Sequence, residues 1–199
     1  MPKELGRPCK GVAFFFGLGL AARNLGEMMP NKDYAIAMAR YNLWQNENLM
    51  GAASGLDDAA RRLDRGAFFA SIEATFAHLL WGDRIWLSRF TGTDAPQATI
   101  LDSVKVGIDW ATFCATRADF DAKILAWAHG VGDAWFLGDL GWFSGAMGRE
   151  VTKPKALLVL HMFNHQTHHR GQIHAMLTAA RARPGDTNIP FMPARFDTL

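Results

Sequence analysis

Four long segments with the residue spacing of amphipathic helices limit the folds open to this chain. They run from about Asp33 to Ala53, from about Arg65 to Phe90, from about Trp110 to His129, and from near Pro154 to just before the sequence RPGD. Asp64 precedes the second segment as a suitable N-cap, and Gly130 follows the third as a suitable end. Four such helices in one chain of 199 residues predict an all-α domain, a four-helix bundle, in which cofactor sites lie between facing helices.

The segment between the third and fourth helices has a different composition. It reads VGDAWFLGDLGWFSGAMGREVTKPK, is rich in glycine and aromatic residues, and has no helical period. We therefore expect a hairpin or an ordered loop between these helices. Within it, Trp142 is the aromatic residue that we expect to line a pocket or a dimer face.

Residues 1–30 are expected to form an N-terminal extension, and the domain is expected to cover residues 31–199. The extension has basic residues followed by an apolar run of about a dozen residues, which has the outline of a secretion signal but is too short to span a bilayer. A signal and a loosely attached extension are both open at this point. No other stretch is long and apolar enough to cross a membrane, and we expect a cytoplasmic protein without membrane contact.

The charged residues and cysteines exclude several classes of function. The chain has 21 Lys and Arg against 19 Asp and Glu, a net charge of +2, and the basic residues are scattered, so no nucleic-acid partner is expected. Cys9 and Cys114 stand apart, which excludes a disulfide framework and a sulfur-rich metal site. The sequence also lacks a P-loop, a nucleophile elbow and the paired Glu-x-x-His pattern of di-iron bundles.

Histidines are concentrated in the fourth helix, where the sequence HMFNHQTHHRGQIH holds five of the seven in the chain. At about 100° per residue, His165 and His169 fall one turn apart within the sector that most apolar residues of this helix occupy. Imidazoles at positions i and i+4 lie close enough to bind one ion. His161 and His168 fall at the edge of that sector, where a substrate can meet them. His174 points away from it.

A third metal ligand is expected outside the fourth helix, because a catalytic metal usually has three protein ligands and one position for water or substrate. Only His78 and His129 remain. His129 ends the third helix, where an imidazole can interact with the helix dipole. His78 lies in the middle of the second helix, to one side of its apolar stripe. This position predicts a metal in a groove at the side of the bundle rather than at its centre.

Asp83 lies in the middle of the apolar stripe of the second helix. A buried carboxylate needs a cation or a hydrogen-bond donor. We expect Arg170 to be its partner, with an imidazole of the fourth helix as the second candidate. In that second case Asp83 would orient a metal ligand. A surface salt bridge is the remaining interpretation.

Three stretches resemble those of one protein family. HMFNHQTHHRGQIHAML is similar to the terminal motif of the DinB/YfiT-like superfamily, while FAHLLWGDRIWLSRFTG and YNLWQNENLM resemble its second-helix motif and its opening helix. The resemblance covers about residues 31–195. It implies a four-helix bundle whose metal site takes one histidine from the second helix and two, four residues apart, from the last. The corresponding residues are His78, His165 and His169.

The resemblance also implies a function and an assembly. Relatives bind divalent metals, zinc or nickel first with iron and manganese as further candidates, often as homodimers, and several are transferases or isomerases that use a low-molecular-weight thiol. We therefore expect a metal-dependent thiol transferase or isomerase acting on a small-molecule substrate, with His161 or His168 moving protons. Arg170 would hold an anionic substrate if Asp83 does not pair with it. The alternatives are a metal-dependent hydrolase, a metal-binding stress-response protein without catalysis, and a bundle without metal.

Overall fold

The computed structural model describes residues 30–145 and 147–197. The predicted N-terminal extension, with Cys9, lies outside the described residues apart from Pro30. The helices are α1 (Lys32–Ser54), α2 (Asp58–Arg62), α3 (Ile72–Thr91), α4 (Trp110–Gly130), α5 (Asp133–Phe136), α6 (Lys155–Ala179) and α7 (Ala194–Asp197), with a 3-10 turn at Ile189–Phe191, and the strands are β1 (Asp139–Ser144) and β2 (Arg149–Pro154).

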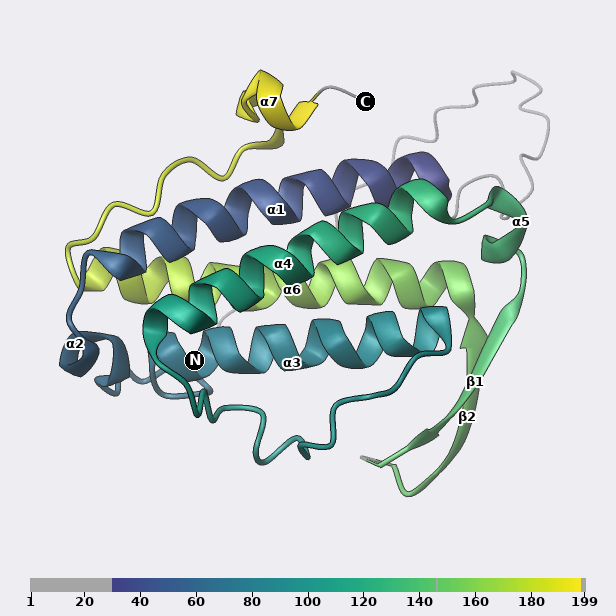
Figure 1. Ribbon diagram of the computed structural model, residues 1–199, viewed down its shortest axis with the longest axis horizontal. Coiled ribbons are helices and arrows are strands. Elements are labelled where there is room, and N and C mark those ends of the chain that lie inside the picture. The colour runs from purple at the N-terminus through teal and green to yellow at the C-terminus, as the bar shows by residue number, and fades with distance from the viewer. Residues whose placement is uncertain (1–29, 146, 198–199) are drawn as a thin grey trace, which may run out of the picture.

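The long helices α1, α3, α4 and α6 form the bundle (Figure 1), which confirms the predicted fold. α1 packs against both α4 and α6, and α6 packs against α3, whereas α3 and α4 make few direct contacts. The connection from residue 92 to residue 109 runs back along the length of the bundle, so that α3 and α4 point in the same direction (Figure 1). Among the described residues, no helix is long and apolar enough to cross a membrane.

The start of α3 differs from the prediction, which placed it at Arg65 behind an Asp64 cap. Asp64 instead accepts a hydrogen bond from the backbone N–H of Gly66 at 2.8 Å, which closes a turn. Gly66 and Ala70 have φ angles of 74° and 61°, and an α-helix excludes such angles. The helix begins only after Ser71, whose side chain accepts a hydrogen bond from the first turn. The apolar spacing continues through this loop, which is why the sequence pattern alone placed the start too early.

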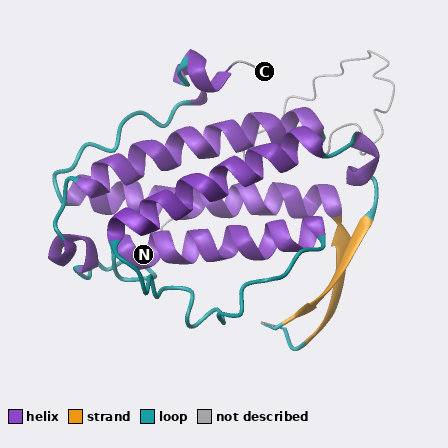
Figure 2. Cartoon of the chain, viewed as in Figure 1, coloured by secondary structure: helices purple, strands orange, loops and turns teal. Residues whose placement is uncertain are grey.

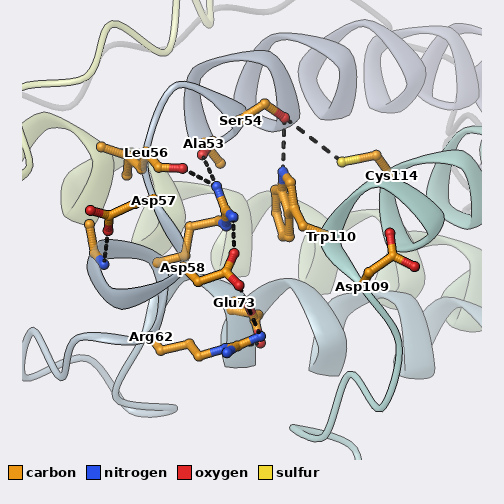
Figure 3. A network of polar contacts seen from close by, with 12 residues as sticks. Ala53, Ser54, Leu56, Asp57, Asp58, Arg62, Glu73, Asp109, Trp110 and Cys114 are labelled. Atoms are coloured by element: carbon orange, nitrogen blue, oxygen red, sulfur yellow. Dashed lines mark hydrogen bonds and ion pairs between the residues drawn. The ribbon is translucent and has the colours of Figure 1, made fainter.

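The short helix α2, which was not predicted, is held against the end of α1 by polar contacts (Figure 3). Arg61 is 5% exposed and donates a hydrogen bond to the Ala53 carbonyl at 3.2 Å. Its guanidinium lies 4.7 Å from the centre of the Trp110 ring, and the Trp110 indole donates to Ser54 Oγ at 2.9 Å. These contacts join α1, α2 and α4 at the end of the bundle from which the loop leads into α3.

β1 and β2 form the predicted hairpin between α4 and α6, at the opposite end of the bundle from α2 (Figure 2). The Trp142 ring packs edge to face against Trp86 of α3, with ring centres 5.6 Å apart. The Arg89 guanidinium lies 5.2 Å from the centre of the Trp142 ring. Trp142 therefore fastens the hairpin to α3, and its predicted part in a dimer face stays a prediction.

Among the described residues, two large apolar clusters of the core are separated by a layer of buried polar side chains, and a third, small cluster joins α1 to α7. The layer consists of Asn42 and Asn46 from α1, Asp83 from α3, Arg117 and Asp121 from α4, and Gln166 and Arg170 from α6. Its hydrogen bonds run from α1 to α4, from α4 to α3, from α3 to α6 and from α6 back to α1. Since buried polar groups are costly unless they are bonded, this closed circuit favours one alignment of the four helices along the bundle axis.

Candidate metal centre

The structure brings the three predicted ligands together. His78 of α3 and His165 and His169 of α6 each offer a ring nitrogen, and these nitrogens all lie within 4.8 Å of one another. The Nε2 atoms of His78 and His165 are 3.3 Å apart. Because α3 packs directly on α6, the middle of one helix faces the one-turn pair of the other. His78 and His169 are buried and His165 is half-buried, so His165 is the most exposed residue of the three.

Hydrogen bonds define the tautomer of His78. Its Nδ1 lies 2.8 Å from Ser103 Oγ, and that hydroxyl donates to the Ile100 carbonyl at 2.6 Å. Because the hydroxyl proton is used there, Ser103 Oγ accepts the Nδ1–H of His78. This proton placement follows from the hydrogen-bond network. It leaves a lone pair on His78 Nε2, the atom that faces His165.

His169 is oriented by a neighbour on its own helix. Its Nδ1 lies 2.9 Å from Gln172 Oε1, an oxygen that only accepts, so Nδ1 carries the proton and Nε2 the lone pair. The amide nitrogen of Gln172 in turn donates to His168 Nε2 at 3.3 Å. Bonds from the second ring nitrogen to a nearby oxygen orient the imidazoles of many protein metal sites. Two of the three imidazoles in the cluster therefore present Nε2 as the free donor atom.

Gly82 makes room for His165. A Cβ atom at position 82 would lie 2.9 Å from His165 Cε1 and 3.4 Å from its Nδ1, and the first of these distances is shorter than van der Waals contact allows. The ring therefore lies directly against the backbone of α3. Its Nδ1 is buried and has no hydrogen-bond partner among the described residues. Packing against Gly82, rather than a hydrogen bond at Nδ1, sets the position of this ring.

The donor atoms are compatible with a divalent metal. With Zn–N distances near 2.0–2.1 Å, neighbouring ligand nitrogens of a tetrahedral site lie about 3.3 Å apart, and the Nε2 atoms of His78 and His165 are separated by 3.3 Å. Burial, and next the charge of His169, lowers the pKa of His78 to about 4. Burial, and next the charges of neighbouring histidines, lowers the pKa of His165 to about 3. The pKa of His169 is also lowered, mainly by burial. All three imidazoles are therefore neutral at pH 7, the form that binds metals.

Aromatic side chains cover the cluster. The Phe69 ring, from the loop before α3, has its centre 4.0 Å from that of His78 and 5.5 Å from that of His169. The Trp81 ring lies 5.7 Å from that of His78, and its indole N–H donates to the Ala98 carbonyl at 2.8 Å. These contacts come from α3 and from the two loops that flank it. The cluster thus lies at the side of the bundle, as the position of His78 around its helix predicts.

His161 and His168 lie beside the cluster and are exposed, as predicted. The His161 ring is 6.0 Å from that of His165, and the His168 ring is 4.9 Å from that of His169. Partial burial, and next the charge of Arg89, lowers the pKa of His161. Both imidazoles are therefore placed where a molecule at the cluster can meet them.

The comparison with protein families agrees with this geometry. A sequence model of the DinB family matches residues 29–194. The chain belongs to the DinB family. The match spans the whole bundle and all three clustered histidines, so it confirms the resemblance seen in the sequence motifs. A comparison with curated proteins gave no match. Family membership supports the fold of this DinB protein and leaves its reaction to be argued from the site.

The predicted pairing of Asp83 with Arg170 was wrong. The Asp83 carboxylate accepts hydrogen bonds from Arg117 at 2.7 Å and from Gln166 at 2.9 Å. Arg170 donates to the side-chain oxygen of Asn42 instead. Asp83 is 0% exposed and Arg170 is 4% exposed, so both lie within the polar layer of the DinB bundle. The predicted substrate contact of Arg170 and the predicted orienting role of Asp83 have no support from these positions.

Three residues that shape the cluster in this DinB protein were not predicted. Gln172 follows His169 by three residues, and the sequence carried that signal because side chains at i and i+3 are neighbours on a helix. Ser103 lies in a connection without helical periodicity, 25 residues from His78, and nothing in the sequence links the two. Gly82 affects the cluster only because α6 packs on α3, and the sequence alone does not show which helices pack together.

Proposed function

We propose that this DinB family protein is a metal-dependent enzyme that uses a small thiol in a transfer or isomerisation of a small-molecule substrate. The observation that carries the proposal is the cluster of three neutral imidazoles, His78, His165 and His169, whose ring nitrogens lie within 4.8 Å of one another. Zinc and nickel suit imidazole ligands best, with iron and manganese as the next candidates. A homodimer and a cytoplasmic location, both expected from the sequence, stay predictions.

The chemistry rests on what lies around the cluster. A divalent cation held by the three imidazoles would supply a Lewis acid that favours a thiolate over a thiol. His161 lies one helical turn from His165, and its lowered pKa keeps it neutral at pH 7, so it can accept the proton that the thiol loses. His168 is the second candidate for this proton, since it is exposed and is linked to His169 through Gln172.

The surroundings of the cluster suit an organic substrate. Phe69 and Trp81 place flat apolar surfaces beside the imidazoles, and such walls exclude water and pack against a carbon skeleton. His165 is half-buried and is the most exposed residue of the cluster, so in this proposal the substrate approaches on its side. An electrophilic small molecule can therefore approach a thiol at the cluster from that side, with His161 within reach.

Elemental analysis of protein purified without a histidine tag tests the metal part of the proposal. We expect about one equivalent of metal in the wild type and less than about a tenth in His165→Ala. His174→Ala is the matched control, because His174 is a partly buried histidine of the same helix outside the cluster, and it should retain the metal. A wild type with less than about a tenth of an equivalent after incubation with zinc or nickel would contradict the proposal.

A screen of the metal-loaded protein with several small thiols and electrophiles tests the reaction. Product formation that requires both the thiol and His165 supports a thiol transferase or isomerase. Hydrolysis of an ester or amide without any thiol favours a hydrolase instead. If removal of the metal unfolds the protein and no substrate reacts, the site is structural, because a structural ion contributes directly to folding.

A further inference from the structure

The side of the bundle between α3 and α4 carries a groove that the proposed function does not use. These two helices make few direct contacts, and the 92–109 connection runs along their side of the bundle (Figure 1). Two hollows lie there, one of about 670 Å³ beside the C-terminal halves of the helices and one of about 440 Å³ beside their N-terminal halves. Arg84 and Pro96 line both hollows. The two hollows therefore adjoin at Arg84 and Pro96, and together they are called the groove.

Arg84 is a half-buried cation that has no counter-ion among the described residues. Its guanidinium lies 5.7 Å from the centre of the Phe120 ring. Within the part of the chain that the structure describes, no carboxylate lies within ion-pair distance of it and no acceptor lies within hydrogen-bond distance. Burial, and next the charge of Arg117, lowers the pKa of Arg84. Because a partly desolvated cation without a partner is costly, its place in an accessible groove indicates a position for an anion.

The larger hollow combines a second cation with apolar walls. Lys123 of α4 lines it together with the rings of Phe120 and Trp127 and the side chain of Leu87. Asp94 of the connection also lines this hollow, so its lining has one carboxylate and two cations, Arg84 and Lys123. A few charged groups among flat apolar surfaces are typical of sites for small organic molecules.

The smaller hollow offers no comparable charge. Asp102 and Lys105, which line it, form an ion pair of 2.6 Å and so neutralise one another. Trp81 and Ser103 also line it and separate it from His78, whose ring both contact. The excess positive charge of the groove therefore lies at Arg84 and in the larger hollow, on a different face of α3 from the imidazole cluster.

We propose that the groove between α3 and α4 is a second binding site, which takes a small organic anion with an aromatic or aliphatic body. The anionic group pairs with Arg84, where both hollows meet, and the body lies along Phe120 and Trp127. Lys123 adds a longer-range attraction from the exposed rim. This site is independent of the metal cluster and of whether the proposed thiol chemistry holds.

Titration calorimetry of the full-length protein with 1-naphthoate, and with the neutral 1-naphthalenemethanol as its uncharged counterpart, tests this site. We expect saturable binding of the naphthoate, weakened by salt, and binding of the alcohol that is about tenfold or more weaker, as for the loss of a charge-assisted hydrogen bond. Arg84→Met keeps the apolar stem of the side chain and should weaken naphthoate binding about tenfold or more while leaving the alcohol unchanged.

Two further variants keep the test decisive. Arg89→Met is the matched control, because Arg89 is a half-buried arginine of the same helix that stacks on Trp86 and Trp142 away from the groove, and it should bind naphthoate like the wild type. Lys123→Met changes an exposed residue, so it should fold even if Arg84→Met does not, and it should weaken binding by a few fold with a shallower salt dependence.

Three results would overturn the proposal. Equal binding of the acid and the alcohol would show an apolar groove without anion recognition. Equal losses of naphthoate affinity in Arg84→Met and Arg89→Met would show that removal of any positive charge weakens binding and that Arg84 makes no specific contact. The absence of saturable naphthoate binding to the wild type at about millimolar concentration would show that no such site exists.

Discussion

Replacement of Gly82 by alanine tests the packing that places His165. The new Cβ would lie 2.9 Å from His165 Cε1, so restoring a carbon–carbon contact of about 3.5 Å moves the ring by about 0.6 Å. Metal–ligand distances tolerate only about 0.2 Å. A displacement of this size costs about 1–3 kcal/mol when the ring has to stay in place. We therefore expect the metal affinity of Gly82→Ala to fall about tenfold to a hundredfold.

The metal-free form of Gly82→Ala should behave differently from the metal-bound form. Without a metal the His165 ring is free to move away from the new methyl group, and alanine is favoured over glycine inside a helix by about 1 kcal/mol. The free energy of unfolding of the metal-free protein should thus stay the same or rise slightly. The expected loss of metal affinity and the expected change in the free energy of unfolding can be distinguished, because one measurement follows metal binding and the other follows folding.

Competition of the protein with a chromogenic chelator measures the affinity, and urea denaturation of the metal-free protein measures the stability. Gly51→Ala is the control, because Gly51 lies within α1 and a Cβ there would meet nothing within 4 Å. This variant should gain about 1 kcal/mol of stability with an unchanged affinity. If Gly82→Ala binds zinc and nickel as tightly as Gly51→Ala does, the inference that Gly82 positions His165 is wrong.

Three further changes have defined outcomes. The pKa of His78 is lowered to about 4, and protonation removes the lone pair that binds metal, so at saturating metal the protein should retain the ion on acidification to about pH 5 and lose it below that pH. Loss centred at pH 6 or above at saturating metal would contradict the expectation that the three imidazoles stay neutral there. Asp83→Ala should lower the free energy of unfolding by about 3–5 kcal/mol because it leaves buried Arg117 short of a partner, whereas Asp102→Ala, in an exposed ion pair, should change it by less than about 1 kcal/mol. Ala70→Gly should raise the free energy of unfolding by about 0.5–1 kcal/mol, since Ala70 has a φ of 61° and glycine relieves this strain at a smaller entropic cost. A lower melting temperature in thermal denaturation would contradict this expectation.

The parts of the structure that could be predicted depend on relations within one helix. His165 and His169 are one turn apart wherever their segment is helical, so their joint orientation followed from the spacing alone. The hairpin around Trp142 followed from the loss of helical period and from the glycine content. The prediction that His78 joins His165 and His169 rested on two further facts. Histidines are scarce elsewhere in the chain, and the motif around His78 resembles that of a known family.

The parts that could not be predicted depend on relations between segments. The partner of Asp83 proved to be Arg117, 34 residues away, and no periodicity says which residues of two helices meet across a core. Arg170 was chosen because it lies close to the histidines in the sequence. In the fold it donates a hydrogen bond to Asn42 of α1 instead, so the choice was wrong. The loop before α3 kept an apolar spacing although Ala70 leaves the helical conformation there, so the pattern extended the helix too far.

The hydrogen bond between Ser103 and His78 gives a surface loop an influence on the candidate metal centre that its composition does not reveal. Loops that join bundle helices usually accept insertions and exchanges of residues with little consequence. Here a lengthened or shortened 92–109 segment would pull one hydroxyl away from Nδ1 and free the imidazole to rotate or change tautomer, although no residue of the cluster had been altered. Exchanging this connection between relatives is therefore a way to change the orientation of His78 without altering the cluster itself.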